Sequence, residues 1–338
     1  MKLAVLGGGP SSEHAVSLQT SAFVLQCLRA RGHSAHALLL SRDVDSDQRC
    51  RWSLGDAQQG FDELAAAPSR SEEDSLSILR EEGFTIFIGL HGPFGEDGQV
   101  QRRLEAAGVP YSGSGPAASE LGMDKELSKI AATKLHARTA SHELIQPEQT
   151  TPRNALGKRL GYPLVIKPVS AGSSMGVSLV RDADSLDAAL QAARAEDTRG
   201  RVLAEEYMPG VEVACSVFRR AGELVVLPLV SVHPAAEFYD YEAKYSSEAT
   251  RYCCPAETSA EQRHEIERLA RGLYDALQLR GVVRVDFILP ESGGRPVFLE
   301  LNTLPGFTSH SLVPMAAREA GIDPGELLEA VLDDLDHV

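Results

Sequence analysis

The first third of the chain alternates short apolar runs with stretches of helical periodicity. Residues 3–6 form an apolar run that ends in Gly7-Gly8-Gly9-Pro10, and residues 35–40 and 85–90 are similar runs. Between the first two, apolar positions follow a helical period that Gly32 ends. Buried parallel strands joined by crossover helices have this pattern. We therefore predict an open, mainly parallel sheet at the N-terminus.

The pattern changes beyond residue 112. A strand pattern at 164–167 leads into a loop rich in Gly and Ser, and 201–205 is a further short strand pattern. Longer strand patterns follow at 212–218, 224–232, 282–289 and 296–301. Helical periods precede the third of these and end the chain. This mixture predicts α+β modules after the N-terminal α/β domain.

A chain of 338 residues is too long for one ordinary domain. The changes in pattern predict three domains, at residues 1–112, 113–206 and 207–338. The fold class is therefore α/β and α+β, with an N-terminal open parallel sheet domain. The polar stretch 43–82 predicts irregular connections with one helix near 61–67.

Net charge limits the kinds of binding partner, and the cysteine pattern indicates the cellular compartment. Lys and Arg number 33 against 48 Asp and Glu, so the net charge is −15, which disfavours nucleic acid and anionic membranes. The five cysteines form no CxxC pair, which favours free thiols in a reducing compartment. We find no signal-peptide pattern and no apolar run of membrane-spanning length, so we expect a soluble cytoplasmic protein.

The first glycine-rich loop lies between a strand and a helix, with Ser11 or Ser12 placed to cap that helix. Backbone N–H groups in such a loop favour an anion, as in dinucleotide-binding proteins. The fingerprint is incomplete, because Ser12 stands where the third glycine is required. A nicotinamide-dependent oxidoreductase and a simple tight turn both stay open as interpretations, the former disfavoured.

A second glycine-rich loop runs from Lys167 to Gly176. It supplies a lysine at a strand end, and then serines and glycines with hydroxyl and backbone donors for phosphate oxygens. The loop does not match the P-loop pattern. Taken alone, it is equally typical of a flexible surface hairpin.

The strongest chemistry lies on two strand patterns near the C-terminus. Arg284 and Asp286 alternate with apolar residues, and so do Glu300 and Asn302. Residues two apart on a strand share a face. Adjacent strands of this kind present Asp, Glu and Asn oxygens, which suit Mg²⁺ beside nucleotide phosphates, and Arg284 suits a developing oxyanion. A solvated face with an ordinary ion pair is the alternative.

Several segments, taken in order, resemble the D-alanine–D-alanine ligases of the ATP-grasp superfamily. The resemblance runs nearly end to end and is poorest at 43–82. The segments that carry it are Gly8-Gly9-Pro10-Ser11-Ser12-Glu13-His14, Leu90-His91-Gly92 with Gly95-Glu96-Asp97-Gly98, Met123-Asp124-Lys125, the Lys167–Gly176 loop, Phe238-Tyr239-Asp240-Tyr241-Glu242-Ala243-Lys244-Tyr245, Glu300-x-Asn302-Thr303, and Thr308-Ser309-His310-Ser311-Leu312.

The resemblance implies a three-domain ATP-grasp fold with ATP held between the central and C-terminal domains. Lys125 and Lys167 would contact phosphates, and Glu205 and Glu212 would hold the adenosine. The full set of ATP-binding residues that it implies is Lys125, Lys167, Ser173, Ser174, Glu205, Glu206, Tyr207, Met208, Glu212 and Lys244. The implied cofactors are ATP and two Mg²⁺ ions, replaceable by Mn²⁺, on Asp286, Glu300 and Asn302.

The same resemblance implies where D-alanine binds and reacts. Glu13 would hold the ammonium of the first D-alanine, with His91 nearby. Ser311 and the Leu312 amide would hold the carboxylate of the second. The implied catalytic residues are Glu13, Ser173, Tyr245, Arg284 and Gly306, of which Arg284 and the Gly306 amide would face the tetrahedral intermediate.

The implied reaction is ATP-dependent formation of D-alanyl-D-alanine through D-alanyl phosphate, for peptidoglycan synthesis. Acyl phosphates hydrolyse, so the segment 233–254 and the serine-rich loop would act as lids. The resemblance also implies a homodimer. D-Serine as second substrate and a non-catalytic nucleotide-binding regulator stay open as alternatives. We expect Glu300→Gln and Arg284→Ala to abolish turnover and keep the fold.

Overall fold

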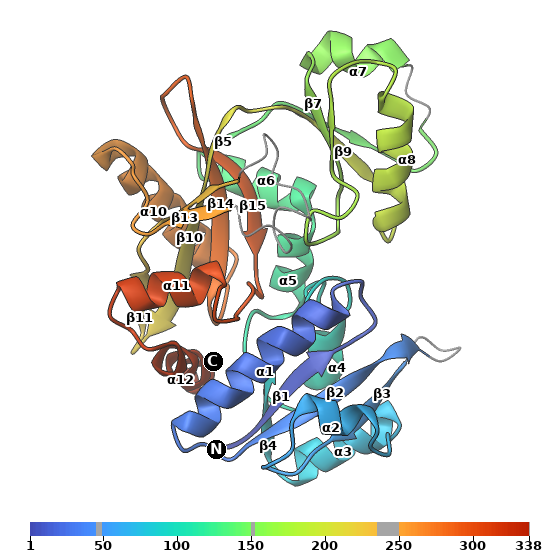
Figure 1. The fold of residues 1–338 in the computed structure, drawn as a ribbon, viewed down its shortest axis with the longest axis vertical. Coiled ribbons are helices and arrows are strands. Elements are labelled where there is room, and N and C mark those ends of the chain that lie inside the picture. The colour runs from blue at the N-terminus through green and yellow to red at the C-terminus, as the bar shows by residue number, and fades with distance from the viewer. Residues whose placement is uncertain (45–48, 150–152, 235–249, 338) are drawn as a thin grey trace.

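The computed structural model describes residues 1–44, 49–149, 153–234 and 250–337, arranged around three sheets (Figure 1). The N-terminal sheet has the order β3-β2-β1-β4, in which β1 pairs in parallel with both β2 and β4. The open parallel sheet is thus confirmed. Its strands are β1 (Lys2–Gly8), β2 (Ala35–Val44), β3 (Cys50–Leu54) and β4 (Phe84–Ile88), and its main helices are α1 (His14–Ala30) and α4 (Gln99–Ala107).

The helix predicted near 61–67 is confirmed as α2 (Phe61–Ala65), but the irregular connections predicted for the rest of 43–82 are wrong where β3 and α3 (Glu72–Glu81) form. Strand β3 pairs antiparallel with β2 at the sheet edge, and α2 and α3 follow it. The start of α3 has a recognisable cap, because the Ser71 hydroxyl accepts a hydrogen bond from the Asp74 N–H. Three acidic residues in its first turn also favour the positive end of the helix dipole.

The central sheet is a separate, wholly antiparallel unit of order β6-β9-β7-β8. Its two helices are drawn at the upper right of Figure 1 and enclose a core of their own. The elements are β6 (His142–Ile145), α7 (Arg153–Leu160), β7 (Leu164–Pro168), β8 (Ser178–Val180), α8 (Leu186–Glu196) and β9 (Val202–Glu206).

The C-terminal sheet has the order β13-β12-β10-β14-β15-β5, with β11 also paired to β10. Helix α10 covers one face through a buried apolar stripe. The elements are β5 (Arg138–Thr139), β10 (Gly210–Arg220), β11 (Glu223–Val226), β12 (Val230–His233), β13 (Arg251–Cys253), α10 (Ala260–Ala276), β14 (Val283–Pro290), β15 (Val297–Asn302), α11 (Leu312–Glu319), α12 (Pro324–Asp333) and the short η1 (Asp334–His337).

The single long strand predicted over 224–232 is instead two strands, β11 and β12. Both pair antiparallel with β10, but the ladder is interrupted between them, around Pro228. Proline has no N–H to donate to a ladder, so it breaks a run that is apolar throughout.

Helices α5 (Pro116–Met123) and α6 (Lys125–Lys134) lie between the three sheets, in the middle of Figure 1. Asp124 ends α5 and caps α6, where its side chain accepts a hydrogen bond from the Leu127 N–H. Although 113–206 is predicted as one domain, β5 pairs with β15 of the C-terminal sheet. The three-domain division stays a prediction.

The N-terminal and C-terminal regions share one hydrophobic core. Val24 and Leu28 of α1 pack in the same cluster as Leu327, Leu328 and Val331 of α12. Ion pairs surround this contact, with Arg31 2.6 Å from Glu329. Within the described parts of the chain, no helix has the length and apolar content needed to cross a membrane.

Candidate active site

Strands β14 and β15 bring the predicted metal ligands together. They pair antiparallel, with Asp286 opposite Glu300 and Arg284 opposite Asn302. The alternation in the sequence therefore places these four side chains on neighbouring positions of one sheet, as predicted.

Asp286 is the hub of this cluster. Its side chain is 1 % exposed and accepts two hydrogen bonds of 2.8 Å from the Arg284 guanidinium and one of 2.9 Å from the Asn302 amide. Burial acts to lower the pKa of Arg284, but Asp286 and Glu300 outweigh it and raise that pKa above its usual range. The site therefore holds a permanent cation against a carboxylate pair.

The donor set fits a hard divalent cation. Asp286, Glu300 and Asn302 offer carboxylate and amide oxygens, the ligands that Mg²⁺ prefers. Within the described ranges no three His, Cys, Asp or Glu side chains gather into a metal cluster. Two carboxylates and one amide leave room for phosphate oxygens as further ligands.

Lys125, the first residue of α6, connects the carboxylates to the serine-rich loop. Its ammonium donates to the Ala171 carbonyl at 2.7 Å and lies 3.7 Å from Glu300. The lysine side chain is only 10 % exposed, so its charge acts in a region of low dielectric. This arrangement brings the second glycine-rich loop and the carboxylate strands to one place.

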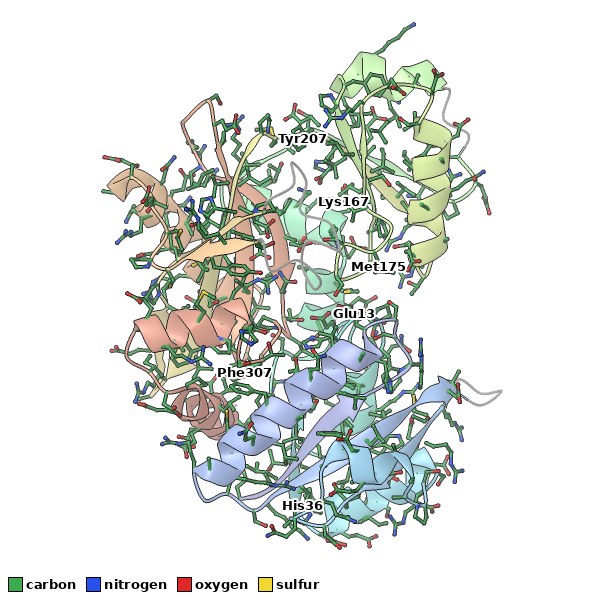
Figure 2. The ribbon with its side chains drawn as sticks, viewed as in Figure 1. Glu13, His36, Lys167, Met175, Tyr207 and Phe307 are labelled. Carbon is green, nitrogen blue, oxygen red and sulfur yellow. The ribbon has the colours of Figure 1, made fainter. Side chains whose placement is uncertain are left out.

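The serine-rich loop reaches the N-terminal domain through Ser173, whose hydroxyl donates to Glu13. Ser173 and Ser174 have positive φ values of 49° and 55°, a conformation that is costly for residues other than glycine. The Glu13 carboxylate also packs against Gly172 and Gly92, where a Cβ would lie 2.4 Å and 2.5 Å from its Oε2. Figure 2 shows Glu13 close to the loop that carries Met175.

A buried charge cluster lies at the other end of this loop. The Glu205 carboxylate is 2.6 Å from the Lys167 ammonium and 2.8 Å from that of Lys129. Burial alone would raise the pKa of Glu205, but the two lysines outweigh it and hold that pKa at about 2. The carboxylate is therefore ionised at any physiological pH.

The segment after β9 leads from the central sheet into the C-terminal sheet. The Tyr207 N–H donates to Pro163, and Glu206 accepts from the Ser141 N–H at 3.0 Å. Met208 and Glu212 are both half-buried, and Glu212 lies on β10 opposite Ile288 of β14. This linker therefore leads into β10, the strand next to β14, as the position of Tyr207 in Figure 2 allows the reader to follow.

Ser311 lies at the N-terminal end of α11, and Leu312 is the first residue of that helix. The Ser311 hydroxyl accepts from the Thr308 N–H at 2.9 Å. A Cβ on Gly306 would lie 3.2 Å from the Ser311 Oγ, so the Gly306 backbone faces this helix end. A helix N-terminus favours a carboxylate.

Two glycine N–H groups of the first glycine-rich loop are already used within the protein. The Gly8 N–H donates to Ser17 Oγ at 2.9 Å and the Gly9 N–H to the Leu40 carbonyl at 3.1 Å. Neither serine caps α1; instead Ser11 Oγ donates to the His91 carbonyl and accepts from the Glu13 N–H. The loop therefore positions Glu13, which argues against the nicotinamide-dependent alternative.

Two residues that sequence reasoning left unassigned join the site. Lys129 is fully buried beside Glu205, and its spacing of four from Lys125 on α6 was a readable signal. Burial and the neighbouring Glu13 carboxylate raise the pKa of Glu96 to about 8. The predicted residues Lys244 and Tyr245, and most of the 233–254 segment, lie outside the described residues.

The fold and this cluster of lysines, carboxylates and a serine-rich loop define an ATP-grasp enzyme. Residues 2–114 match the family profile described as D-ala D-ala ligase N-terminus, and residues 136–333 match D-ala D-ala ligase C-terminus. The chain belongs to the D-alanine–D-alanine ligase family.

Relatives over the full length agree with this membership. The chain is 41 % identical to the D-alanine–D-alanine ligase B of Chromobacterium violaceum, covering 100 % of this chain and 98 % of that protein. It is 39 % identical to the Nitrosospira multiformis D-alanine–D-alanine ligase, covering 100 % and 97 %.

Solved structures show the same fold. The VanG D-Ala:D-Ser ligase of Enterococcus faecalis superimposes with a TM-score of 0.79 at 29 % identity, covering 99 % of each chain. The Bacillus anthracis D-alanine–D-alanine ligase gives 0.77 at 32 % identity, covering 100 % of this chain and 98 % of that one.

Proposed function

We propose that this protein is an ADP-forming ligase that joins two D-alanine molecules into D-alanyl-D-alanine for peptidoglycan synthesis. The observation that carries the proposal is the single cluster formed by Glu13, Ser173 and Lys125 with Arg284 and the β14–β15 carboxylates. Its members come from all three sheet regions. Family membership supports the same activity.

In the proposed first step, a carboxylate oxygen of the first D-alanine attacks the γ-phosphorus of ATP, giving D-alanyl phosphate and ADP. Glu13 holds the ammonium of this D-alanine, and Ser173 keeps the Glu13 carboxylate in place through their hydrogen bond. Lys125, with Lys244 from the lid segment, neutralises charge on the transferring phosphoryl group.

In the second step, the amine of the second D-alanine attacks the acyl carbon, and the tetrahedral intermediate expels phosphate. Arg284 and the Gly306 N–H stabilise the oxyanion, while Ser311 and the Leu312 amide hold the carboxylate of the incoming D-alanine. Tyr245 completes the Glu13–Ser173 hydrogen-bond network. Ser174 and its neighbours in the serine-rich loop exclude water from the acyl phosphate.

Glu205 and Glu212 hold the adenosine, with Glu206, Tyr207 and Met208 along the base. Because the Lys167 ammonium is 2.6 Å from Glu205, we assign Lys167 to the phosphate nearest the nucleoside. Asp286, Glu300 and Asn302 would hold Mg²⁺, which supplies charge neutralisation to the phosphates when bound. Two ions, replacement by Mn²⁺, a homodimer and a cytoplasmic location are the remaining parts of the proposal.

The test is phosphate release from ATP with Mg²⁺ and D-alanine, L-alanine, D-serine or D-lactate, with mass spectrometry of the products. We expect release with D-alanine and a product with the mass of the dipeptide. A mixed D-alanyl-D-serine product formed in preference would move this chain to the specificity named for VanG. No release with any of the four would overturn the substrate assignment.

A further inference from the structure

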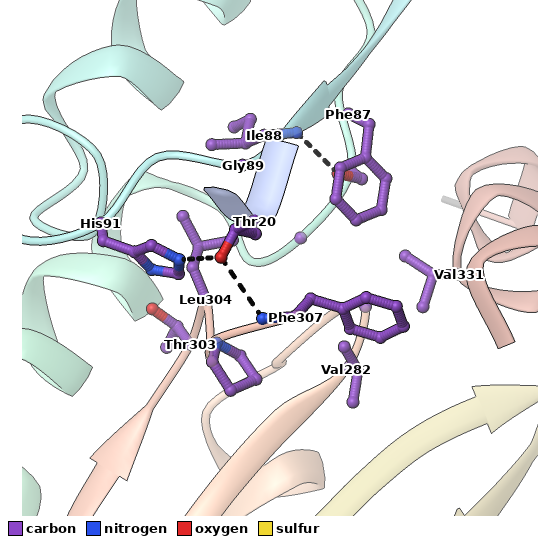
Figure 3. A pocket seen from close by; sticks show the side chains of 14 residues that line it. Thr20, Phe87, Ile88, Gly89, His91, Val282, Thr303, Leu304, Phe307 and Val331 are labelled. Carbon is purple, nitrogen blue, oxygen red and sulfur yellow. Dashed lines mark hydrogen bonds between the residues drawn. The ribbon is translucent and has the colours of Figure 1, made fainter. Parts of the chain in front are cut away.

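The loop that carries Gly306 is tied to the N-terminal region on both sides of that glycine. The Phe307 N–H donates to Thr20 Oγ1 at 3.5 Å, and Thr20 Oγ1 is 2.8 Å from His91 Nε2. The Leu304 backbone lies in the same pocket as this imidazole and favours its protonated form. Figure 3 shows Thr20 between His91 and Phe307, in a small pocket at the junction of the two regions.

The side chains of Thr20 and His91 are both buried at this contact. Thr20 is 2 % exposed and His91 is 6 % exposed. Burial lowers the pKa of His91 to about 4, so the ring is neutral at physiological pH. A neutral imidazole has one donor and one acceptor, and an unpaired buried polar atom is costly, so the contact with Thr20 orients the ring.

We propose that Thr20 and His91 are positioning residues that hold segment 304–307 in place, and so aim the Gly306 N–H at the tetrahedral intermediate. The inference rests on the proposed ligase function. Glu13 is the N-cap residue of α1, and Thr20 lies seven residues further along the same helix. The N-terminal part of one helix thus positions both the first D-alanine, through Glu13, and segment 304–307, through Thr20.

This arrangement predicts an effect on one step of the reaction. The Gly306 N–H is needed after the acyl phosphate has formed, when charge develops on the carbonyl oxygen. Misplacing it slows attack by the amine and leaves the acyl phosphate exposed to water for longer. A loosened loop therefore gives phosphate without dipeptide, whereas a general loss of folded protein lowers both products equally.

The experiment measures phosphate and dipeptide together for Thr20→Val, an isosteric change that removes only the hydroxyl. We expect dipeptide formation to fall about 10²-fold, with the ratio of phosphate to dipeptide rising well above one and the KM for ATP unchanged. Thr20→Ser keeps the hydroxyl, and we expect its ratio of phosphate to dipeptide to stay near one. Thr85→Val, the same change at another buried threonine on β4, is the control.

The outcomes separate this inference from the proposed function. An inactive wild-type protein would remove the ligase assignment itself. An active wild type with a ratio near one in Thr20→Val, whether its rate is normal or reduced, would overturn the positioning role. Circular dichroism and the transition temperature of each variant identify losses that come from unfolding.

Discussion

The burial of Asp286 determines how much stability the protein loses when its partner Arg284 is replaced. Its carboxylate is 1 % exposed and relies on Arg284 for compensation. Arg284→Ala would leave that charge buried and unpaired, which costs about 3–5 kcal/mol. The expectation from sequence that this variant keeps its fold is therefore replaced by one of marked destabilisation, and Glu300 becomes the better probe.

Glu300→Gln should keep the fold and abolish ligation. The Glu300 side chain is 21 % exposed and loses only a carboxylate oxygen, whereas a metal held by Asp286 and Asn302 loses a ligand. We expect dipeptide formation to fall by at least about 100-fold with unchanged circular dichroism. Glu291→Gln, an exposed change after the end of β14, is the control. Undiminished dipeptide formation by natively folded Glu300→Gln would remove Glu300 from the metal site.

Glu96 should make the stability of the ligand-free protein depend on pH. Its folded-state pKa of about 8 lies above the usual 4.5, so the folded state binds the extra proton. The stability it contributes is fully present below pH 4.5 and is lost as pH rises through 8, with a slope of at most about 1.4 kcal/mol per pH unit.

Denaturant unfolding of wild type and Glu96→Gln at several pH values measures this effect. The stability of the variant relative to wild type should increase between pH 5 and pH 8. The matched control is Glu73→Gln, at a side chain that is 81 % exposed. A flat difference for Glu96→Gln would mean that Glu96 titrates as an ordinary carboxyl.

Among the elements, β14 and β15 were the most predictable, because alternation on a strand fixes which side chains share a face. The predictions of strands failed where the strands are short. Pro228 splits an apolar run into β11 and β12, and β3 has only five residues. The cap at Ser71 was readable for α3, whereas Thr20 carried no sequence signal because its partner His91 is 71 residues away.

The base of the serine-rich loop depends on Arg201, which joins three elements. Its guanidinium donates to Asp124, the cap of α6, at 2.8 Å and to Ser170 Oγ at 3.0 Å. Because the Asp124 side chain is 6 % exposed, Arg201→Met should lower the unfolding free energy by about 3 kcal/mol. Denaturant unfolding measures the loss.

The matched control for this prediction is a surface pair. Arg159 bonds Glu143 with side-chain exposures of 50 % and 28 %, so Arg159→Met should destabilise the fold much less than Arg201→Met does. Equal losses in the two variants would mean that the Asp124–Arg201 pair gains nothing from its burial.

At the scale of the whole molecule, the sequence predicted an N-terminal parallel sheet followed by α+β modules, but not how these regions pack. Helices show their own apolar stripes, and no pattern within α1 or α12 states that the two face each other. That contact joins residues about 300 positions apart into one core. The core under β7 and α8 is made from residues close in sequence and involves neither helix.

The arrangement of these cores predicts which regions of the protein are destabilised by a substitution in one core. Trp52 is the only tryptophan and is fully buried in the N-terminal sheet domain, so its fluorescence reports the unfolding of that domain. Leu328 on α12 is 0 % exposed in the core shared with α1. Strand β1 contributes Leu3 and Val5 to that shared core and Ala4 and Leu6 to the core around Trp52, so Leu328→Ala should shift the Trp52 transition by about 2–5 kcal/mol.

Leu190→Ala removes the same atoms from the core of the central sheet, where Leu190 is 5 % exposed. We expect it to leave the Trp52 transition unchanged and to lower a separate circular dichroism transition, because sites with no shared partners act independently. An equal shift of the Trp52 signal by both variants would show that the chain unfolds as one cooperative unit.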